Sequence, residues 1–259
     1  MAETMTTRSA DRRAKKDVAA ASGTLAKLRV KTFADGTDLA SLREIQANPL
    51  VKGFTTNPTL MRKSGIVDYR TFARTMLDTV RDRPVSFEVL SDDFEVMYRQ
   101  ATELATWGPN VFVKIPITDT RGASSADLLR RLAREGVQLN VTAITTLEQV
   151  VRALDAVAAS PAAVISVFAG RIADTGRDPM PVMRQAVEVI SPHLNLELLW
   201  ASPREVLNVY QADEVGCQIV TVTADILRKL ELAGRDLHEV SLDTVRMFVR
   251  DAELAGLEL

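Results

Sequence analysis

The chain has 259 residues, of which 46% are hydrophobic and 25% charged, a composition typical of a globular protein that buries its own core. The formal net charge of −2 gives no basic field for nucleic acid or an anionic membrane surface. A single cysteine, Cys217, excludes an internal disulfide and a cysteine-based zinc site. No apolar stretch approaches the ~18 residues of a membrane span. We therefore expect a cytoplasmic protein without nucleic-acid or membrane partners.

The first 25 residues differ from the rest of the chain. They are polar, rich in Arg and Lys, and show no apolar periodicity. We expect a disordered leader over residues 1–25, with a targeting segment as the alternative.

Eight short apolar runs rich in β-forming residues follow the leader. They lie at residues 28–34, 52–57, 85–90, 111–117, 139–144, 163–170, 196–201 and 219–224. Amphipathic stretches with helical periodicity separate them, at the spacing of a strand plus a crossover helix. No glycine-rich nucleotide fingerprint follows any run. The pattern predicts an α/β protein, a single (β/α)8 TIM barrel over residues 26–259 with a C-terminal helix.

Helix boundaries have their usual signals. Asp93, Ser125 and Thr146 stand where helices should begin, and Gly136 and Gly216 stand where helices should end. Because the active sites of such barrels collect at the carboxyl ends of the strands, the polar residues found there are candidate site residues.

Lys114 is the most unusual of these residues, because it interrupts the apolar run VFVKIPI. Strand alternation puts Lys114 on the barrel interior, between Glu88 on one neighbouring strand and Asn140 and Thr142 on the other. A desolvated lysine favours the neutral amine, which is a nucleophile. A structural ion pair between Lys114 and Glu88 is the alternative. The nearby Asp35 favours catalysis, because barrels normally fill this interior with branched apolar side chains.

Four segments carry a resemblance to a known family. GFTTNPTLM (53–61), FVKIPIT (112–118), EGVQLNVTAI (135–144) and SVFAGRIAD (166–174) resemble signatures of the transaldolase and fructose-6-phosphate aldolase family. The resemblance runs in order from about residue 28 to the C-terminus. It implies a barrel enzyme that forms a Schiff base on a lysine.

The resemblance also implies roles for individual residues. Lys114 takes the Schiff-base position, Asp35 that of the acid/base aspartate, and Glu88 that of a glutamate typical of transaldolases, which shares a catalytic water with Thr142. The residues implied to bind substrate are Asn57, Asn140 and Ser166 for the dihydroxyacetone hydroxyls, and Phe168 and Arg171 beside the sugar chain and phosphate.

One segment departs from the family pattern. After the seventh strand the family has a serine followed by a second phosphate-binding cation, whereas this chain reads LWASPREVL. Ser202 keeps the serine, and Arg204 is the substitute for the cation. The resemblance therefore leaves the phosphate-binding residues at this end of the site unassigned.

The implied function is transfer of a dihydroxyacetone unit from a ketose or ketose phosphate to an aldose or aldose phosphate. The resemblance implies no cofactor and no metal, small-molecule sugar or sugar phosphate partners, and a homo-oligomer. Two alternatives stay open: cleavage or synthesis of the fructose-6-phosphate aldolase type without transfer, and a non-catalytic sugar-binding barrel.

Overall fold

The computed structural model describes residues 28–36 and 39–258. The leader predicted at residues 1–25 lies outside the described residues. Two compact units are distinguished, one at Arg29–Leu227 and one that includes Arg228–Leu259. The first unit is the barrel.

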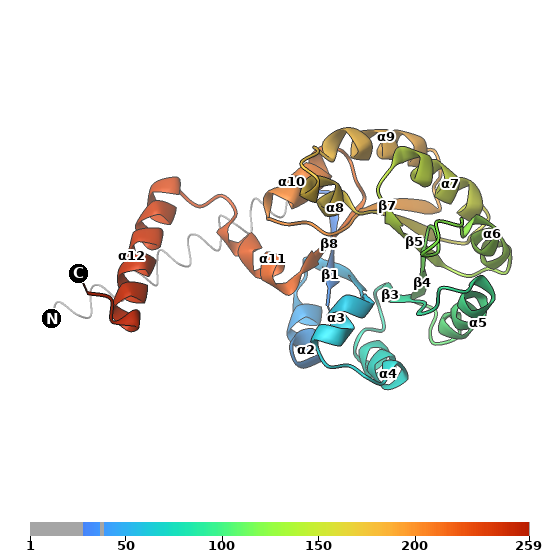
Figure 1. Cartoon of the computed structure of the whole chain (residues 1–259), viewed down its shortest axis with the longest axis horizontal. Helices are drawn as coiled ribbons and strands as arrows, with labels where there is room; N and C mark the ends of the chain where they lie inside the picture. The colour runs from blue at the N-terminus through green and yellow to red at the C-terminus, as the bar shows by residue number, and fades with distance from the viewer. Residues whose placement is uncertain (1–27, 37–38, 259) are drawn as a thin grey trace. The chain divides into compact units, whose positions relative to one another are not determined.

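Eight parallel strands close into a barrel in chain order, each paired with its sequence neighbours and β1 with β8. Helices follow the strands and surround them (Figure 1). The strands are β1 (Lys31–Asp35), β2 (Val51–Thr55), β3 (Val85–Glu88), β4 (Val111–Pro116), β5 (Leu139–Ile144), β6 (Ala163–Val167), β7 (Leu196–Trp200) and β8 (Ile219–Thr223). The predicted (β/α)8 fold is confirmed.

The barrel helices occupy the stretches between the strands. They are α2 (Leu39–Ala47), α3 (Pro58–Lys63), α4 (Tyr69–Thr79), α5 (Phe94–Ala105), α6 (Ala126–Arg134), α7 (Leu147–Val157), α8 (Ala169–Asp174), α9 (Met180–Ile190) and α10 (Leu207–Glu214). The next helix, α11 (Ala224–Lys229), spans the boundary between the two units.

Helix ends follow local chemistry, with one exception to the prediction. Asp93 accepts hydrogen bonds from two backbone amides at the start of α5, and Thr146 forms a capping box with Gln149 in α7. Ser125 precedes α6 as predicted, but its hydroxyl donates to the carbonyl of Pro116 and makes no cap. The predicted strand 163–170 ends at Val167, because Phe168 turns the chain into α8.

Apolar side chains fill the lower part of the barrel interior. Phe33, Val164, Leu199 and Ile219 form one buried cluster, and a Lys31–Glu197 ion pair joins β1 to β7 on the same interior face. Gly53 is required opposite Phe33, because a Cβ there would lie 2.5 Å from the Phe33 ring. The active sites of such barrels lie at the opposite end, where the carboxyl ends of the strands are.

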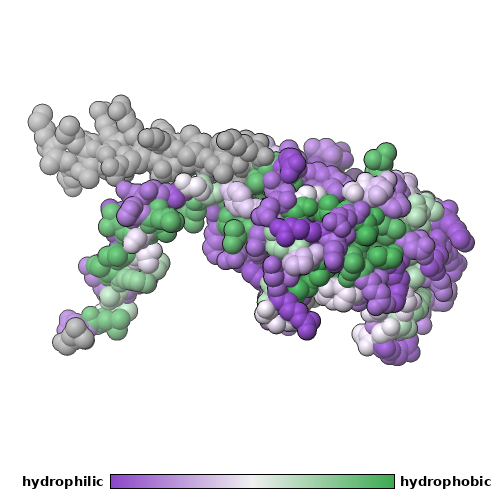
Figure 2. Space-filling view, turned by 90° about the horizontal axis from the view of Figure 1, so that it is seen from above, coloured by the Kyte–Doolittle hydropathy of each residue, from purple (hydrophilic) through white to green (hydrophobic). Residues whose placement is uncertain are grey.

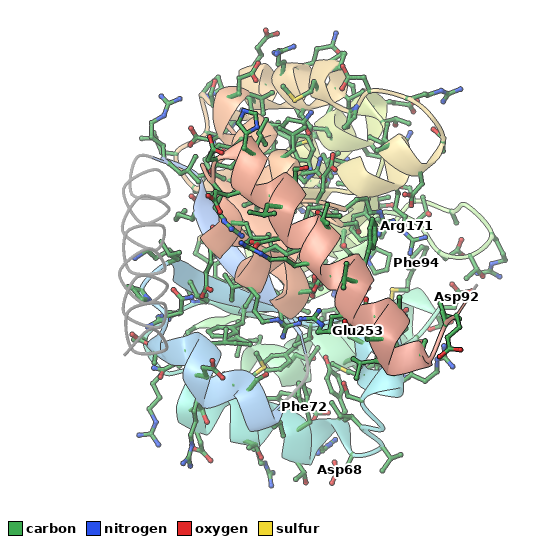
Figure 3. The ribbon with its side chains drawn as sticks, turned by 90° about the vertical axis from the view of Figure 1, so that its left-hand side faces the viewer. Asp68, Phe72, Asp92, Phe94, Arg171 and Glu253 are labelled. Carbon is green, nitrogen blue, oxygen red and sulfur yellow. The ribbon has the colours of Figure 1, made fainter. Side chains whose placement is uncertain are left out.

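The outer helices pack one face on the strands. In α4, Asp68 caps the first turn through the Thr71 amide, and Phe72 and Met76 are buried; Figure 3 labels Asp68 and Phe72. Figure 2 shows hydrophilic and hydrophobic side chains intermingled over the visible face of the barrel. Within the described ranges, no helix combines the length and the hydropathy needed to cross a bilayer.

The second unit contains a short 3-10 helix, η1 (Leu230–Leu232), and the helix α12 (Leu237–Ala255). Asp236 caps α12 by accepting from the amides of His238 and Glu239, and Gly256 ends it with φ of 62°. The helix predicted at the C-terminus is therefore present.

Candidate active site

A cavity of about 390 Å³ opens at the carboxyl ends of the strands. Most residues predicted from the sequence line it: Asp35, Asn57, Glu88, Lys114, Thr142, Ser166, Phe168, Arg171, Ser202 and Arg204. Asn140 is buried but does not line the cavity. The structure therefore brings together predicted residues from seven of the eight strands or the loops that follow them.

Lys114 lies at the floor of this cavity and is only 7% exposed. Its Nζ donates a hydrogen bond of 2.8 Å to the carbonyl of Thr56 and lies 3.3 Å from Oε2 of Glu88. The register of β3 with β4 sets this pair, because Glu88 is directly opposite Lys114. The ion pair considered as a structural alternative is thus present, and the amine also has the access to a cavity that a nucleophile needs. Glu88 is placed to take a proton from it.

Asp35 ends β1 on the same cavity. Its carboxylate accepts hydrogen bonds from Thr55 Oγ1 at 3.0 Å and from Asn57 Nδ2 at 3.3 Å. Although its side chain reaches the cavity, surrounding protein replaces most of its hydration, and this burial raises the pKa of Asp35. The charge of Lys114 and the hydrogen bonds from Thr55 and Asn57 oppose the increase. Asp35 is therefore a stronger base than an ordinary aspartate.

Thr142 offers a free hydroxyl. The residue is 1% exposed, and its Oγ1 has no hydrogen-bond partner in the described part of the chain. Ala143, which follows it and also lines the cavity, has φ of 62°, a left-handed conformation that costs energy outside glycine. The pairing of β5 with β6 shifts register at the same point. This local distortion places an unsatisfied hydroxyl where a water or a substrate can supply its partner.

Two predicted substrate-binding amides are held by protein groups. Asn140 donates to Ser86 Oγ at 3.0 Å and accepts from Ser166 Oγ at 2.7 Å. Asn57 caps α3, because its Oδ1 accepts from the amide of Leu60. Its Nδ2 faces Asp35.

The far end of the cavity is formed by α8 and the loop after β7. Arg171, labelled in Figure 3, projects from α8 and has no ion pair with another described residue. Arg204, predicted to be the second cation, forms a two-point contact with Asp174 instead. Ser202 has φ of 58°, and a Cβ on Gly170 would lie 1.5 Å from its carbonyl oxygen. The loop is thus pressed against the start of α8.

Several lining residues were not predicted, and Thr221 and Lys63 are the two considered next. Thr221 Oγ1 lies 2.5 Å from Thr55 Oγ1, in the network that supports Asp35; alternation of Thr221 and Thr223 in the last strand was a usable signal. Lys63, in the last turn of α3, also lines the cavity, and no sequence signal separates it from other lysines. Among the described residues, no three His, Cys, Asp or Glu side chains are grouped as metal ligands.

Comparison with known proteins identifies the family of the chain. Residues 32–258 match the family described as transaldolase/fructose-6-phosphate aldolase. A "Probable transaldolase" of Dehalococcoides mccartyi is 33% identical over 202 residues, which are 78% of this chain and 90% of that protein. One of Thermoanaerobacter sp. is 32% identical over 233 residues, 89% of this chain and all of that protein.

Solved structures show the fold alone. A 3-hexulose-6-phosphate synthase from Salmonella typhimurium superposes with a TM-score of 0.55 at 15% identity, over 79% of this chain and 94% of that one. The family match spans most of the chain, and this coverage establishes the family to which the chain belongs. The chain belongs to the transaldolase/fructose-6-phosphate aldolase family.

Proposed function

We propose that this protein transfers a dihydroxyacetone unit from a ketose or ketose phosphate to an aldose or aldose phosphate, through a Schiff base on Lys114. The observation that carries the proposal is the Lys114 amine at the floor of the cavity, 3.3 Å from the Glu88 carboxylate. The amine opens on the cavity, where a carbonyl can reach it, and the neighbouring carboxylate can exchange a proton with it.

The first half of the reaction forms the covalent intermediate. Glu88 takes a proton from the ammonium group of Lys114, and the free amine attacks the C2 carbonyl of the ketose. The resulting carbinolamine loses water to give an iminium ion. A water held between Glu88 and the unpartnered hydroxyl of Thr142 moves protons in these steps.

The second half breaks and remakes a carbon–carbon bond. Asp35 removes the proton from the C4 hydroxyl, the C3–C4 bond breaks, and its electron pair moves into the iminium to give an enamine. The aldehyde fragment leaves. An acceptor aldehyde then accepts the enamine electrons and the proton held by Asp35, and hydrolysis releases the new ketose. The raised pKa of Asp35 suits both roles.

Small-molecule sugars as partners, a cytoplasmic location and a homo-oligomer belong to the same proposal. Arg171 at the far end of the cavity, which has no ion pair with a described residue, supports a phosphate on the sugar chain.

Borohydride trapping tests the intermediate. Incubation with fructose 6-phosphate and borohydride should attach a reduced sugar fragment to Lys114, detected by peptide mass mapping. Lys114→Met should lose the adduct and turnover, whereas Lys52→Met, which changes an exposed lysine on β2, should keep both. An adduct on another residue would disprove the assignment.

Product analysis separates transfer from the alternative cleavage. With fructose 6-phosphate alone, dihydroxyacetone should form slowly, and addition of an aldose phosphate should replace it with a new ketose phosphate. Equal release of dihydroxyacetone with and without the acceptor would identify an aldolase instead.

A further inference from the structure

Asp174 lies between two arginines of the candidate site. It is three residues after Arg171 on α8, a spacing at which side chains of a helix meet. It also contacts Arg204, which comes from the loop after β7. Asp174 can therefore neutralise either guanidinium.

The structure shows which arginine it engages. Nε of Arg204 donates to Oδ1 of Asp174 at 3.0 Å, and an Nη of Arg204 donates to Oδ2, so both carboxylate oxygens face Arg204. The pKa of Asp174 is lowered first by the hydrogen bonds from Arg204 and also by its charge, with the charge of Arg171 as a smaller contribution. The backbone amide of Arg204 donates to Asn208 at 2.7 Å, which anchors the loop that carries it.

The consequence concerns Arg171. Arg171 lines the cavity and has no ion pair with another described residue, although an acidic side chain lies on its own helix. If Arg204 were absent, Asp174 would be the nearest partner for Arg171 along α8 and would compete with any anion in the cavity.

We propose that Arg204 is a positioning residue that occupies Asp174 and so keeps Arg171 available for the phosphate of a sugar phosphate. Arg204 itself does not bind that phosphate. This inference deepens the proposed function and rests on it for the substrate. It also explains how a chain that departs from the family pattern after β7 retains an anion site.

Three variants test the inference: Arg204→Gln, Asp174→Asn and the double variant. Both partners are about half exposed, so the effects should be modest. Arg204→Gln should raise KM for fructose 6-phosphate about two- to five-fold with kcat little changed. Asp174→Asn alone should not raise it, and the double variant should return to the KM of the unmodified protein. KM for unphosphorylated fructose should not change in any variant.

The same variants distinguish other roles for Arg204. If it bound the phosphate directly, the double variant would keep the high KM, and the inference would be wrong. If the pair only held the loop, Asp174→Asn alone would also raise KM, for both fructose and its phosphate, which would again overturn it. Arg184→Gln is the matched control, because Arg184 and Glu214 form a similarly exposed pair that joins α9 to α10.

A binding measurement separates this inference from the reaction itself. Calorimetric titration with ribose 5-phosphate requires no turnover. Arg204→Gln should bind it more weakly than the unmodified protein, whereas Asp174→Asn and the double variant should not. If borohydride trapping fails but the affinities follow this pattern, the Schiff base is rejected and the role of Arg204 stands. Equal affinity in Arg204→Gln and the unmodified protein would reject that role.

Discussion

Asp35 is the residue whose surroundings bear most directly on the bond-breaking step. Its carboxylate is needed to remove the C4 hydroxyl proton but has no part in attack by Lys114. Asp35→Asn should therefore reduce cleavage by at least about a hundredfold and leave the borohydride adduct on Lys114 intact. Single-turnover trapping with fructose 6-phosphate measures both quantities. Loss of the adduct along with activity would assign Asp35 to imine formation or to structure.

The pH dependence of stability gives a second test at Asp35. Its pKa is raised in the folded protein, so the folded state binds a proton at higher pH than the unfolded chain does. The wild type therefore gains stability as pH falls through the raised pKa towards the ordinary value of 3.8, and lacks this contribution above the raised pKa.

Asp35→Asn removes the titrating group. We expect the variant to be more stable than the wild type at neutral pH and to lose this advantage progressively in acid. Urea unfolding of both proteins at several pH values measures the difference in the free energy of unfolding. A difference that does not change with pH would contradict the raised pKa.

At the scale of elements, contact between α8 and the loop after β7 depends on one glycine. A Cβ at residue 170 would lie 1.5 Å from the carbonyl oxygen of Ser202, which is backbone and has little freedom to move. Gly170→Ala should lower the free energy of unfolding by about 1–3 kcal/mol. It should also raise KM for the sugar phosphate, because Arg171 is on the next position of α8.

Gly36→Ala is the control for this change. A Cβ at Gly36 meets no atom within 4 Å, and its φ is not in the left-handed region. Thermal and urea unfolding should show little change for Gly36→Ala and a clear loss for Gly170→Ala. Equal stability of the two variants would show that the loop moves away without cost.

The elements that could be predicted are those with a repeating signal. All eight strands were found because buried β-runs alternate with amphipathic helices, and alternation within β4 and β5 correctly put Lys114 and Thr142 inside the barrel. The partners of Ser125 and Arg204 could not be predicted in this way, because a hydroxyl or a guanidinium has several partners within reach. Only the three-dimensional arrangement selects Pro116 for one and Asp174 for the other.

At the scale of the whole molecule, some predictions have no structural test. The leader over residues 1–25 is outside the described residues, and the homo-oligomer remains a prediction. The opening of the barrel unit can be measured through the single cysteine of the chain, which has no role in the proposed chemistry.

Cys217 is 3% exposed, and its thiol donates to the carbonyl of Leu198 at 3.2 Å. Burial raises the pKa of this thiol to about 12, so at pH 8 almost none of it is thiolate. Reaction with Ellman's reagent should therefore be about a thousandfold or more slower in the native protein than in the protein unfolded by urea.

The residue packs inside the barrel unit, so the slow reaction should require opening of that unit and follow the stability measured by urea unfolding. Gly170→Ala, which lowers the free energy of unfolding, should increase the rate. Cys217→Ser supplies the blank, and rapid release of one equivalent of chromophore from the native wild type would show that the barrel opens locally beside β8.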